Sequence, residues 1–400
     1  MGEHTNKQKD KNRVRPPFAA FRESEHRARL ARARKALSNG GFAGAVSIAP
    51  ENLFYIAGYD SLTYFSQQAL VFNTEDGRDP TLIVRDVDLP LAKETTWVSD
   101  IRTYHLHAGD VTELIEKVAR EHEICDGIIG IELESFAVTS AYASALQKQL
   151  EPTELADATT LLNELQYIKS ESEMAYIREA ANYANIGIEA ARRAIRPDIS
   201  EIALCAEVEF AIRQAGSDYP AMPTECASGP RSAGCHAAPM PRILEKGDLV
   251  HLEFAGTARR YHCVSMITAA LGEPGARARA LYDAGLESYR AGLALCKPGA
   301  PVAEIEDASL EPLRSRNLEH AAMMRFGLGI GIGYPPAWVG TFQMDRYSDA
   351  KLERGMLIYV HSCLELLDEG LGIIQGGSYY IGDNDIEALS GAADCELLVV

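Results

Sequence analysis

The stretch Ala227–Gly272 constrains the fold more than any other part of the sequence. Two apolar runs, Leu249–Ala255 and Tyr261–Ala270, lie on either side of Gly256 and are rich in Val, Leu, Phe, Tyr and Ile. That composition is typical of β-strands, so the pattern predicts a β-hairpin. An acid, Glu253, lies inside the first run, and carboxylates are rarely placed in apolar strands without a partner or a chemical role. Glu253 is therefore the first candidate for a catalytic residue.

The size and charge of the chain limit its organisation and its partners. A chain of 400 residues exceeds one ordinary core, so two domains are expected. With 46% hydrophobic and 24% charged residues the chain is globular, and a formal net charge of −18 argues against nucleic acid as a partner. No run reaches the ~18 apolar residues of a membrane span, and the N-terminus has no apolar signal region. We therefore expect no membrane partner.

The cysteines indicate the compartment. None of the eight forms a C-x-x-C pair, and in a chain of this length they are expected to be reduced thiols of a cytoplasmic protein. Cys235 and Cys263 lie near the suspected site, where the role of a small buried apolar residue is expected. The only basic cluster, Lys7–Arg15, belongs to residues 1–20, which are interpreted as a disordered, solubilising tail.

Residues 21–160 have the pattern of an α/β N-terminal domain with a mixed sheet, because predicted strands alternate with predicted helices. A first helix begins near Glu25 and ends at Asn39. The polar segment Glu151–Thr160 is interpreted as a linker. The polar, aromatic loop Gly58–Gln68, which contains Tyr64, is interpreted either as a ligand loop or as an aromatic packing corner. The predicted strands are Phe42–Ile48, Asn52–Ile56, Ala69–Phe72, Thr81–Val84 and Gly127–Ile131, and the further helices are Val111–Arg120 and Val138–Gln149.

Residues 161–400 have the pattern of an α+β domain. A capping box at Ser170–Glu173 predicts the start of a long amphipathic helix that Pro197 ends. The region Leu357–Ile381 is rich in strand-forming residues, and the glycines of Gly327–Gly333 are interpreted as a tight strand bend. Further helices are predicted at Ser200–Gln214, Ala276–Leu295 and Val302–Ser315.

Four longer stretches together resemble the creatinase and aminopeptidase P superfamily. They are LLNELQYIKSESEMAYIREAA (Leu161–Ala181), SGPRSAGCH (Ser228–His236), EKGDLVHLEFAG (Glu245–Gly256) and LERGMLIYV (Leu352–Val360). The resemblance covers nearly the whole chain beyond the basic tail. It implies an α+β pita-bread catalytic domain at residues 161–400, preceded by an α/β creatinase-type N-terminal domain at residues 21–160.

The metallopeptidases of this superfamily bind two divalent metal ions with two Asp, one His and two Glu, and the resemblance places these positions on the present chain. The first Asp position holds Glu253, and the second holds Val264. The metal-binding His position holds Phe326 in the segment RFGLGIGIG. The first Glu position holds His361, and the last falls near Gly376. Val, Phe and Gly have no side-chain ligand atom, so neither a two-metal centre nor another cofactor is expected.

Other members of the superfamily are metal-free hydrolases of small nitrogen compounds, and among them the sequence most resembles the ectoine hydrolases. It departs from them after its two prolines, at Ala337–Gly340, where they have an acid followed by Trp-Gly-Glu. It also has His361 and Glu365 where they have Met and Trp. These departures fall on the substrate pocket, so the framework is better supported than the substrate. The resembling pieces are GYD (Gly58–Asp60), DYPAM (Asp218–Met222), EFAGTARRYHC (Glu253–Cys263) and GIGYPPAW (Gly331–Trp338).

The resemblance and the strand pattern together define a candidate site. Alternation along the first strand of the hairpin places His251, Glu253 and Ala255 on one face. Glu253 is interpreted as the group that attacks the substrate carbon, directly or through a water, and His236 as the proton carrier. The expected substrate-binding residues are His262, Tyr334, Trp338, His361, Asp218 and Tyr64.

The expected function is metal-independent hydrolysis of a C–N bond in a small zwitterionic compound, such as opening of a cyclic amidine to an N-acetylated diamino acid. One alternative is an Xaa-Pro-type metallo-dipeptidase with unusual ligands, which includes a mononuclear site of His236, Glu253 and His361. Others are a creatinase-like amidinohydrolase and a non-catalytic binding protein on the same scaffold. The resemblance also implies a homodimer in which the N-terminal domain of one chain closes the pocket of its neighbour.

Overall fold

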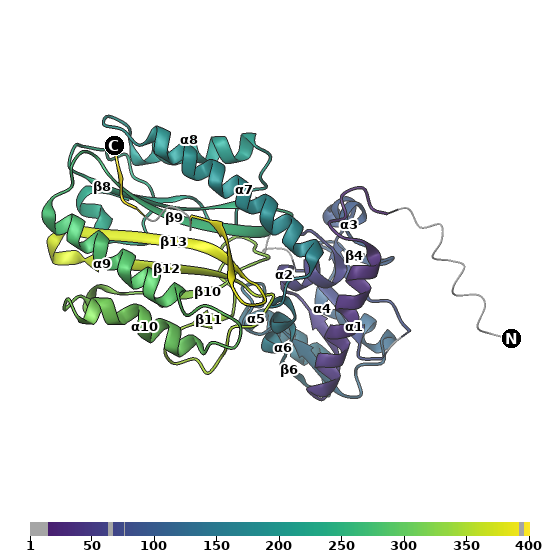
Figure 1. Cartoon of the computed structure of the whole chain (residues 1–400). Helices are drawn as coiled ribbons and strands as arrows, with labels where there is room; N and C mark the ends of the chain where they lie inside the picture. The colour runs from purple at the N-terminus through teal and green to yellow at the C-terminus, as the bar shows by residue number, and fades with distance from the viewer. Residues whose placement is uncertain (1–14, 63–66, 76, 392–395) are drawn as a thin grey trace. The chain divides into compact units, whose positions relative to one another are not determined.

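The chain (Figure 1) divides into two compact units, and their boundary in the sequence falls between Gln166 and Tyr167. The computed structural model describes residues 15–62, 67–75, 77–391 and 396–400. Each unit is built on its own β-sheet. The segment Glu151–Thr160, predicted as a linker, instead contains strand β6 (Leu155–Asp157), which pairs in parallel with β5 (Ile128–Ile131). The polar linker prediction was wrong because an edge strand of three residues is too short to show a periodic pattern.

The N-terminal unit is a mixed sheet of six strands in the order β4-β3-β2-β1-β5-β6. Two neighbouring pairs, β1/β2 and β2/β3, are antiparallel, and the other three pairs are parallel. The remaining strands are β1 (Phe42–Ser47), β2 (Ala69–Asn73), β3 (Thr81–Arg85) and β4 (Asp100–Tyr104). The helices are α1 (Glu23–Asn39), α2 (Pro50–Asn52), α3 (Leu89–Thr95), α4 (Val111–Glu121), α5 (Ser140–Leu150) and α6 (Thr159–Asn163), with short turns η2 (Leu53–Ala57), η3 (Asp86–Asp88) and η4 (Glu164–Gln166).

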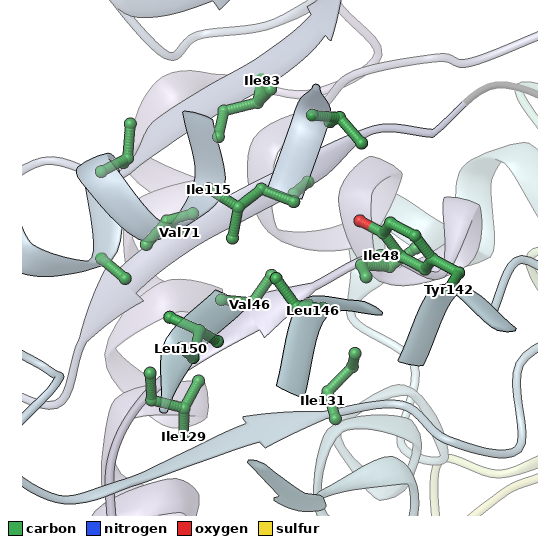
Figure 2. Packing of buried hydrophobic residues seen from close by; sticks show 14 of the residues in the cluster. Val46, Ile48, Val71, Ile83, Ile115, Ile129, Ile131, Tyr142, Leu146 and Leu150 are labelled. Carbon is green, nitrogen blue, oxygen red and sulfur yellow. The ribbon is translucent and has the colours of Figure 1, made fainter. Parts of the chain in front are cut away.

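Helices α4 and α5 form the apolar layer on one face of this sheet (Figure 2). Ile115 of α4 and Leu146 of α5 pack with Val46, Val71 and Ile83 of the strands, and all five side chains are fully buried. Helices recurring between paired strands give the mixed α/β layer that the sequence predicts.

The predicted strand Asn52–Ile56 is helical. Helix α2 runs directly into the π-helical turn η2, and Gly58 ends the segment with a left-handed φ of 70°. Pro50 at the first helical position and glycine after the last one are the usual signals of a helix start and end. The strand prediction was wrong because a short, buried apolar run has no periodicity that separates a strand from a helix.

The C-terminal unit is a nine-stranded sheet whose main path is β11-β10-β12-β13-β9-β8-β7, with β14 paired to β13 and β15 paired to β9. The strands are β7 (Glu225–Ser228), β8 (Leu249–Ala258), β9 (Tyr261–Ala270), β10 (Gly327–Gly329), β11 (Gln343–Met344), β12 (Leu357–Leu366), β13 (Leu371–Ile381), β14 (Ile386–Ser390) and β15 (Leu398–Val399). The helices are α7 (Glu171–Ala194), α8 (Glu201–Gln214), α9 (Ala276–Leu293) and α10 (Val302–Arg314), with short turns η5 (Gly229–Ala233), η6 (Glu319–Ala321) and η7 (Leu367–Glu369).

Long helices cover one face of this sheet (Figure 1). Helix α7 packs on β8, where Phe254 fills the space beside Gly187, and α9 packs on β13, where Ile373 fills the space beside Gly285. The predicted capping box of α7 is present, because the Ser170 hydroxyl accepts from the Glu173 amide and the Glu173 carboxylate accepts from the Ser170 amide. The strand positions between those that face the helices are therefore available for a site on the opposite face.

The predicted hairpin is formed by β8 and β9, but its turn is not at Gly256. Strand β8 continues to Ala258, and Arg259 and Arg260 make the turn with left-handed φ values of 47° and 67°. A Cβ on Gly256 would lie 2.1 Å from the carbonyl oxygen of Ala180 in α7, so glycine permits close helix–sheet contact here. None of the helices in the described part of the chain has the length and apolar character that a bilayer crossing requires.

Candidate functional site

One row of residues crosses the sheet on the face opposite the helices. Glu225 of β7 pairs with Glu253 of β8, Glu253 with Met266 of β9, Met266 with Gly376 of β13, and Gly376 with His361 of β12. Directly opposed residues of neighbouring strands share a face, so these positions belong to one surface. The register thus brings together two of the sequence-predicted residues, Glu253 and His361, and adds Glu225.

Glu253 is a buried acid in the middle of β8. It is 4% exposed, and its Oε1 accepts a hydrogen bond of 3.1 Å from the Tyr359 hydroxyl. Burial raises the pKa of Glu253 well above its usual value, the charge of Glu225 raises it further, and the hydrogen bond from Tyr359 opposes this. Burial and the charge of Glu225 thus both oppose ionisation of Glu253 in the free protein.

Glu225 is a second acid of the site, which the sequence interpretation missed. Burial raises its pKa, while the interaction with His236 lowers it, and its Oε2 accepts a hydrogen bond of 3.3 Å from the Ala237 amide. The sequence signal is a single glutamate directly before the buried Cys226. Strand β7 has only four residues, so its partner strand cannot be inferred from alternation.

His236 lies on the turn that follows η5. Its side chain is exposed, and its charge acts on the pKa values of Glu225 and Cys363. The charges that act on Glu253 come from Glu225 and Cys363 instead. Glu225 therefore links the two residues that the sequence assigns to catalysis: His236 acts on the pKa of Glu225, and Glu225 acts on the pKa of Glu253.

Strand β12 contributes a line of polar side chains to the same face at alternate positions: Tyr359, His361, Cys363 and Glu365. His361 is buried, its Nδ1 lies 3.8 Å from Sγ of Cys363, and its Nε2 has no hydrogen-bond partner among the described residues. Glu365 accepts a hydrogen bond of 2.8 Å from the Cys235 amide. The alternation Y-x-H-x-C-x-E was the signal for Tyr359 and Cys363, which the sequence interpretation did not use.

The remaining predicted residues form a second cluster at the turn end of the hairpin. His262 pairs with Thr257, which is about 13 Å further along β8 than Glu253. Both ring nitrogens of His262 are bonded to the backbone: Nε2 accepts from the Ala221 amide at 2.9 Å and Nδ1 lies 2.8 Å from the Arg260 carbonyl. Burial lowers the pKa of His262 to about 4, so this imidazole is neutral. Because both nitrogens contact backbone groups, neither is available to bind a substrate.

Trp338, Tyr334 and Asp218 surround this second cluster. The Trp338 ring lies 6.0 Å from the His262 ring, and the guanidinium of Arg260 lies 4.8 Å above the ring of Tyr334. Asp218 accepts a hydrogen bond of 2.7 Å from the Arg259 amide and so supports the hairpin turn. Tyr64, the last of the predicted substrate-binding residues, lies outside the described residues.

The donor set does not fit a two-metal centre. Of the five positions that would carry ligands, Val264 and Phe326 are buried apolar residues, and a Cβ added to Gly376 would lie 2.9 Å from Cβ of His361. No group of three or more His, Cys, Asp or Glu side chains in the described ranges is arranged to hold a metal ion. The residues of this face instead present acids, imidazoles and thiols.

The comparisons with known proteins agree with this architecture. The profile of the metallopeptidase family M24 matches residues 175–387, and that of the creatinase/prolidase N-terminal domain matches residues 29–168. The chain belongs to the metallopeptidase family M24, and it is a hydrolase of that family. This confirms the predicted α+β pita-bread catalytic domain preceded by an α/β creatinase-type domain.

The relatives include proteins of two different activities. The chain is 26% identical over 390 residues to the ectoine hydrolase of Halomonas elongata, covering 92% of this chain and 96% of the relative. It is 24% identical over 310 residues to the Xaa-Pro dipeptidase of Pyrococcus horikoshii, covering 77% and 82%. The solved Xaa-Pro dipeptidase from Bacillus anthracis has a TM-score of 0.83 at 23% identity over 94% of this chain and 100% of that chain. This last likeness shows the fold alone.

Proposed function

We propose that this protein hydrolyses a C–N bond in a small zwitterionic nitrogen compound, as an ectoine hydrolase does with a cyclic amidine. The observation that carries the proposal is the paired acids Glu253 and Glu225. No Lys or Arg charge acts on either carboxyl in the described part of the chain. Two adjacent acids, one buried and one half-buried, are costly to ionise together without a Lys or Arg partner, and a planar amidinium with two N–H donors would satisfy them.

Binding of the cation would prepare Glu253 for the reaction. An amidinium beside Glu253 favours its ionised form and so counteracts the rise in pKa that burial and Glu225 cause. The carboxylate then takes a proton from water while the water oxygen forms a C–O bond to the amidine carbon. Direct attack of the Glu253 oxygen on the amidine carbon is the second route: the C–N bond breaks and leaves an O-acyl intermediate. In ¹⁸O-water, attack of water on the Glu253 carbonyl carbon of that intermediate would leave label in Glu253 after a single turnover.

The departing nitrogen needs a proton before the C–N bond breaks. His236, exposed and electrostatically coupled to Glu225, is proposed to deliver it. Cleavage gives one amide and one amine, so that water, amidine and products balance. For a cyclic amidine with an acetyl-derived carbon the product is an N-acetylated diamino acid.

The two further groups of predicted residues have different proposed roles. Nε2 of His361 is buried and has no partner in the described ranges, so we propose that it binds the substrate carboxylate. Trp338, Tyr334 and Asp218 are proposed to line the hairpin end of the pocket. His262 contributes packing against Trp338 rather than a hydrogen bond.

Peptide hydrolysis is the second candidate function, because Xaa-Pro dipeptidases are among the relatives. Because the residues do not fit a two-metal centre, groups other than metal ions would have to polarise the peptide carbonyl. A creatinase-like guanidino substrate would bind to the same acid pair as the amidine. If the protein turned over none of these compounds, it would be a non-catalytic binding protein on the same scaffold.

The test is turnover by protein treated with a chelator, on cyclic and acyclic zwitterionic amidines, guanidino acids and Xaa-Pro dipeptides, followed by mass spectrometry. We expect an amidine to be hydrolysed, and Glu253→Gln to lower kcat by at least about 100-fold because the base is lost. Glu306→Gln is the matched control, since Glu306 is a buried glutamate of α10 whose pKa burial also raises. Near-normal turnover by Glu253→Gln, or hydrolysis of dipeptides only and only after Mn²⁺ is added, would refute the proposal.

We also propose, from the family resemblance, that the protein is a homodimer. Light scattering during size-exclusion chromatography should give twice the chain mass of 43.6 kDa. A mass equal to one chain at micromolar concentration would contradict it.

A further inference from the structure

The turn that carries His236 is tied to the sheet on both sides of that residue. The Cys235 amide, directly before it, donates a hydrogen bond of 2.8 Å to Oε1 of Glu365 on β12. The Ala237 amide, directly after it, donates one of 3.3 Å to Oε2 of Glu225 on β7. Two carboxylates on different strands therefore hold the backbone on either side of His236, and we call these two hydrogen bonds the clamp.

The backbone next to the clamp is attached to strands as well. The Ala237 carbonyl accepts a hydrogen bond of 3.0 Å from the Cys226 amide of β7. In η5, which precedes the turn, the Ser232 carbonyl oxygen lies 3.1 Å from Nε2 of His251. The Ser232 hydroxyl accepts a hydrogen bond of 3.2 Å from the Gly372 amide of β13. The turn is thus anchored at both ends, and the clamp fixes the backbone between the two anchors.

The side chain of His236 gains its position from this backbone. It is exposed, so packing against neighbouring side chains does not define where the imidazole lies. A proton carrier must lie within hydrogen-bond reach of the group that receives the proton, and a displacement of about 1 Å can cost a factor of about 100 in rate. A device that holds the backbone is therefore needed if His236 is to act at one place.

We propose that Glu365 is a positioning residue for His236, and that it acts together with Glu225 through the clamp. This inference rests on the proposed function, in which His236 delivers a proton to the departing nitrogen. Glu365 itself does not contact the reacting atoms in this assignment. Its half-buried carboxylate holds the amide of the residue before the proton carrier.

Glu365 allows the clamp to be tested apart from the acid pair. The effects on the pKa of Glu253 come from burial, Glu225, Cys363 and Tyr359. Loss of Glu365 is therefore expected to leave the ionisation of Glu253 unchanged, whereas loss of Glu225 would disturb both the clamp and the acid pair.

The first experiment measures hydrogen–deuterium exchange of the full-length protein by mass spectrometry, with fragmentation that resolves single amides of residues 231–239. We expect the Cys235 amide to exchange at least about tenfold faster in Glu365→Leu than in the wild-type protein, because leucine cannot accept its hydrogen bond. Glu365→Gln should keep the slow exchange, since its side-chain oxygen is an acceptor. Equal exchange in the wild-type protein and Glu365→Leu would overturn the proposal.

Glu387 of β14 provides the matched control. It is also a glutamate on a strand of this sheet, but its carboxylate pairs with Arg178 of α7. Glu387→Leu should leave the exchange of the Cys235 amide unchanged. If Glu387→Leu and Glu365→Leu accelerated this exchange equally, the cause would be general destabilisation, and the clamp would be refuted.

Steady-state kinetics with the hydrolysed amidine then tests the positioning role. Glu365→Leu should lower kcat by about tenfold and leave KM within about twofold, because the clamp places the proton carrier and does not bind the substrate. Glu365→Gln should keep kcat within about twofold of the wild-type value. Faster exchange without a fall in kcat would overturn the positioning role. Absence of turnover by the wild-type protein would instead refute the proposed function, and the exchange data alone would then decide whether the clamp exists.

Discussion

After burial, the charge of Glu225 has the largest effect on the pKa of Glu253, and it acts across the β7–β8 pair. The Glu225 charge raises the pKa of Glu253, so Glu225→Gln should lower it and make the base form available in more acidic solution. We expect the acidic midpoint of the kcat/KM profile to move down by about one pH unit. An unchanged midpoint would mean that Glu225 does not act on the group that limits the rate.

Tyr359 should act in the opposite direction. Its hydroxyl donates to Glu253, and a hydrogen bond to the carboxylate favours the charged form and lowers the pKa. Tyr359→Phe should therefore raise the acidic midpoint of the same profile by up to about one unit. A shift of the same sign in Tyr359→Phe and Glu225→Gln would show that the two variants act through general destabilisation instead.

Some residues of the candidate site could be predicted from the sequence, and others could not. Glu253 could be predicted because an acid inside an apolar, alternating run is unusual in itself. Glu225 could not, since it acquires its role from a partner strand far away in the sequence. The alternation along β12 marks Tyr359 as a residue of one face, but no pattern indicates that its hydroxyl meets Glu253. The two nitrogens of His262 are used by the backbone of Ala221 and Arg260, and no spacing in the sequence indicates that.

The contact between α7 and β8 depends on the missing side chain of Gly256. A Cβ there would lie 2.1 Å from the carbonyl oxygen of Ala180 and 2.4 Å from the amide nitrogen of Ala184, and neither backbone atom can move without shifting α7. Gly256→Ala should lower the free energy of unfolding by about 1–3 kcal/mol, measured by urea denaturation.

Gly275 provides the matched control for this element. It precedes α9, has a negative φ, and nothing lies within 4 Å of an added Cβ. Gly275→Ala should leave stability unchanged or raise it by about 0.4–1 kcal/mol. Equal effects of the two substitutions would contradict the close approach of α7.

The hairpin itself was predictable, whereas its turn was not. Composition and alternation identify both strands, but glycine between two apolar runs suggests a turn, and only the position of α7 shows that Gly256 serves helix packing. The turn at Arg259 and Arg260 has no glycine, asparagine or aspartate to reveal its left-handed backbone.

At the scale of the whole molecule, each unit has its own sheet and its own apolar core. A unit with a core of its own can fold alone. We expect fragments 15–166 and 167–400, produced separately, each to unfold in one cooperative transition when followed by circular dichroism in urea. A fragment that unfolds without a transition would show that it needs the other unit.

The division into an α/β part followed by an α+β part could be predicted from the order of helical and strand periods along the chain. The reaction could not be predicted in this way. Framework motifs indicate the family, but the row of residues at the candidate site is assembled by the register of five strands: Glu225, Glu253, Met266, Gly376 and His361.

The two faces of strand β12 carry different kinds of side chain. Odd-numbered positions hold Tyr359, His361, Cys363 and Glu365, while Ile358, Val360 and Leu364 at even positions are anchored in the core. Substitutions on this strand can therefore change one odd position at a time while the core residues at the even positions stay in place. Inserting or deleting a single residue would have the reverse effect, turning every reactive group inward and every anchor outward at once.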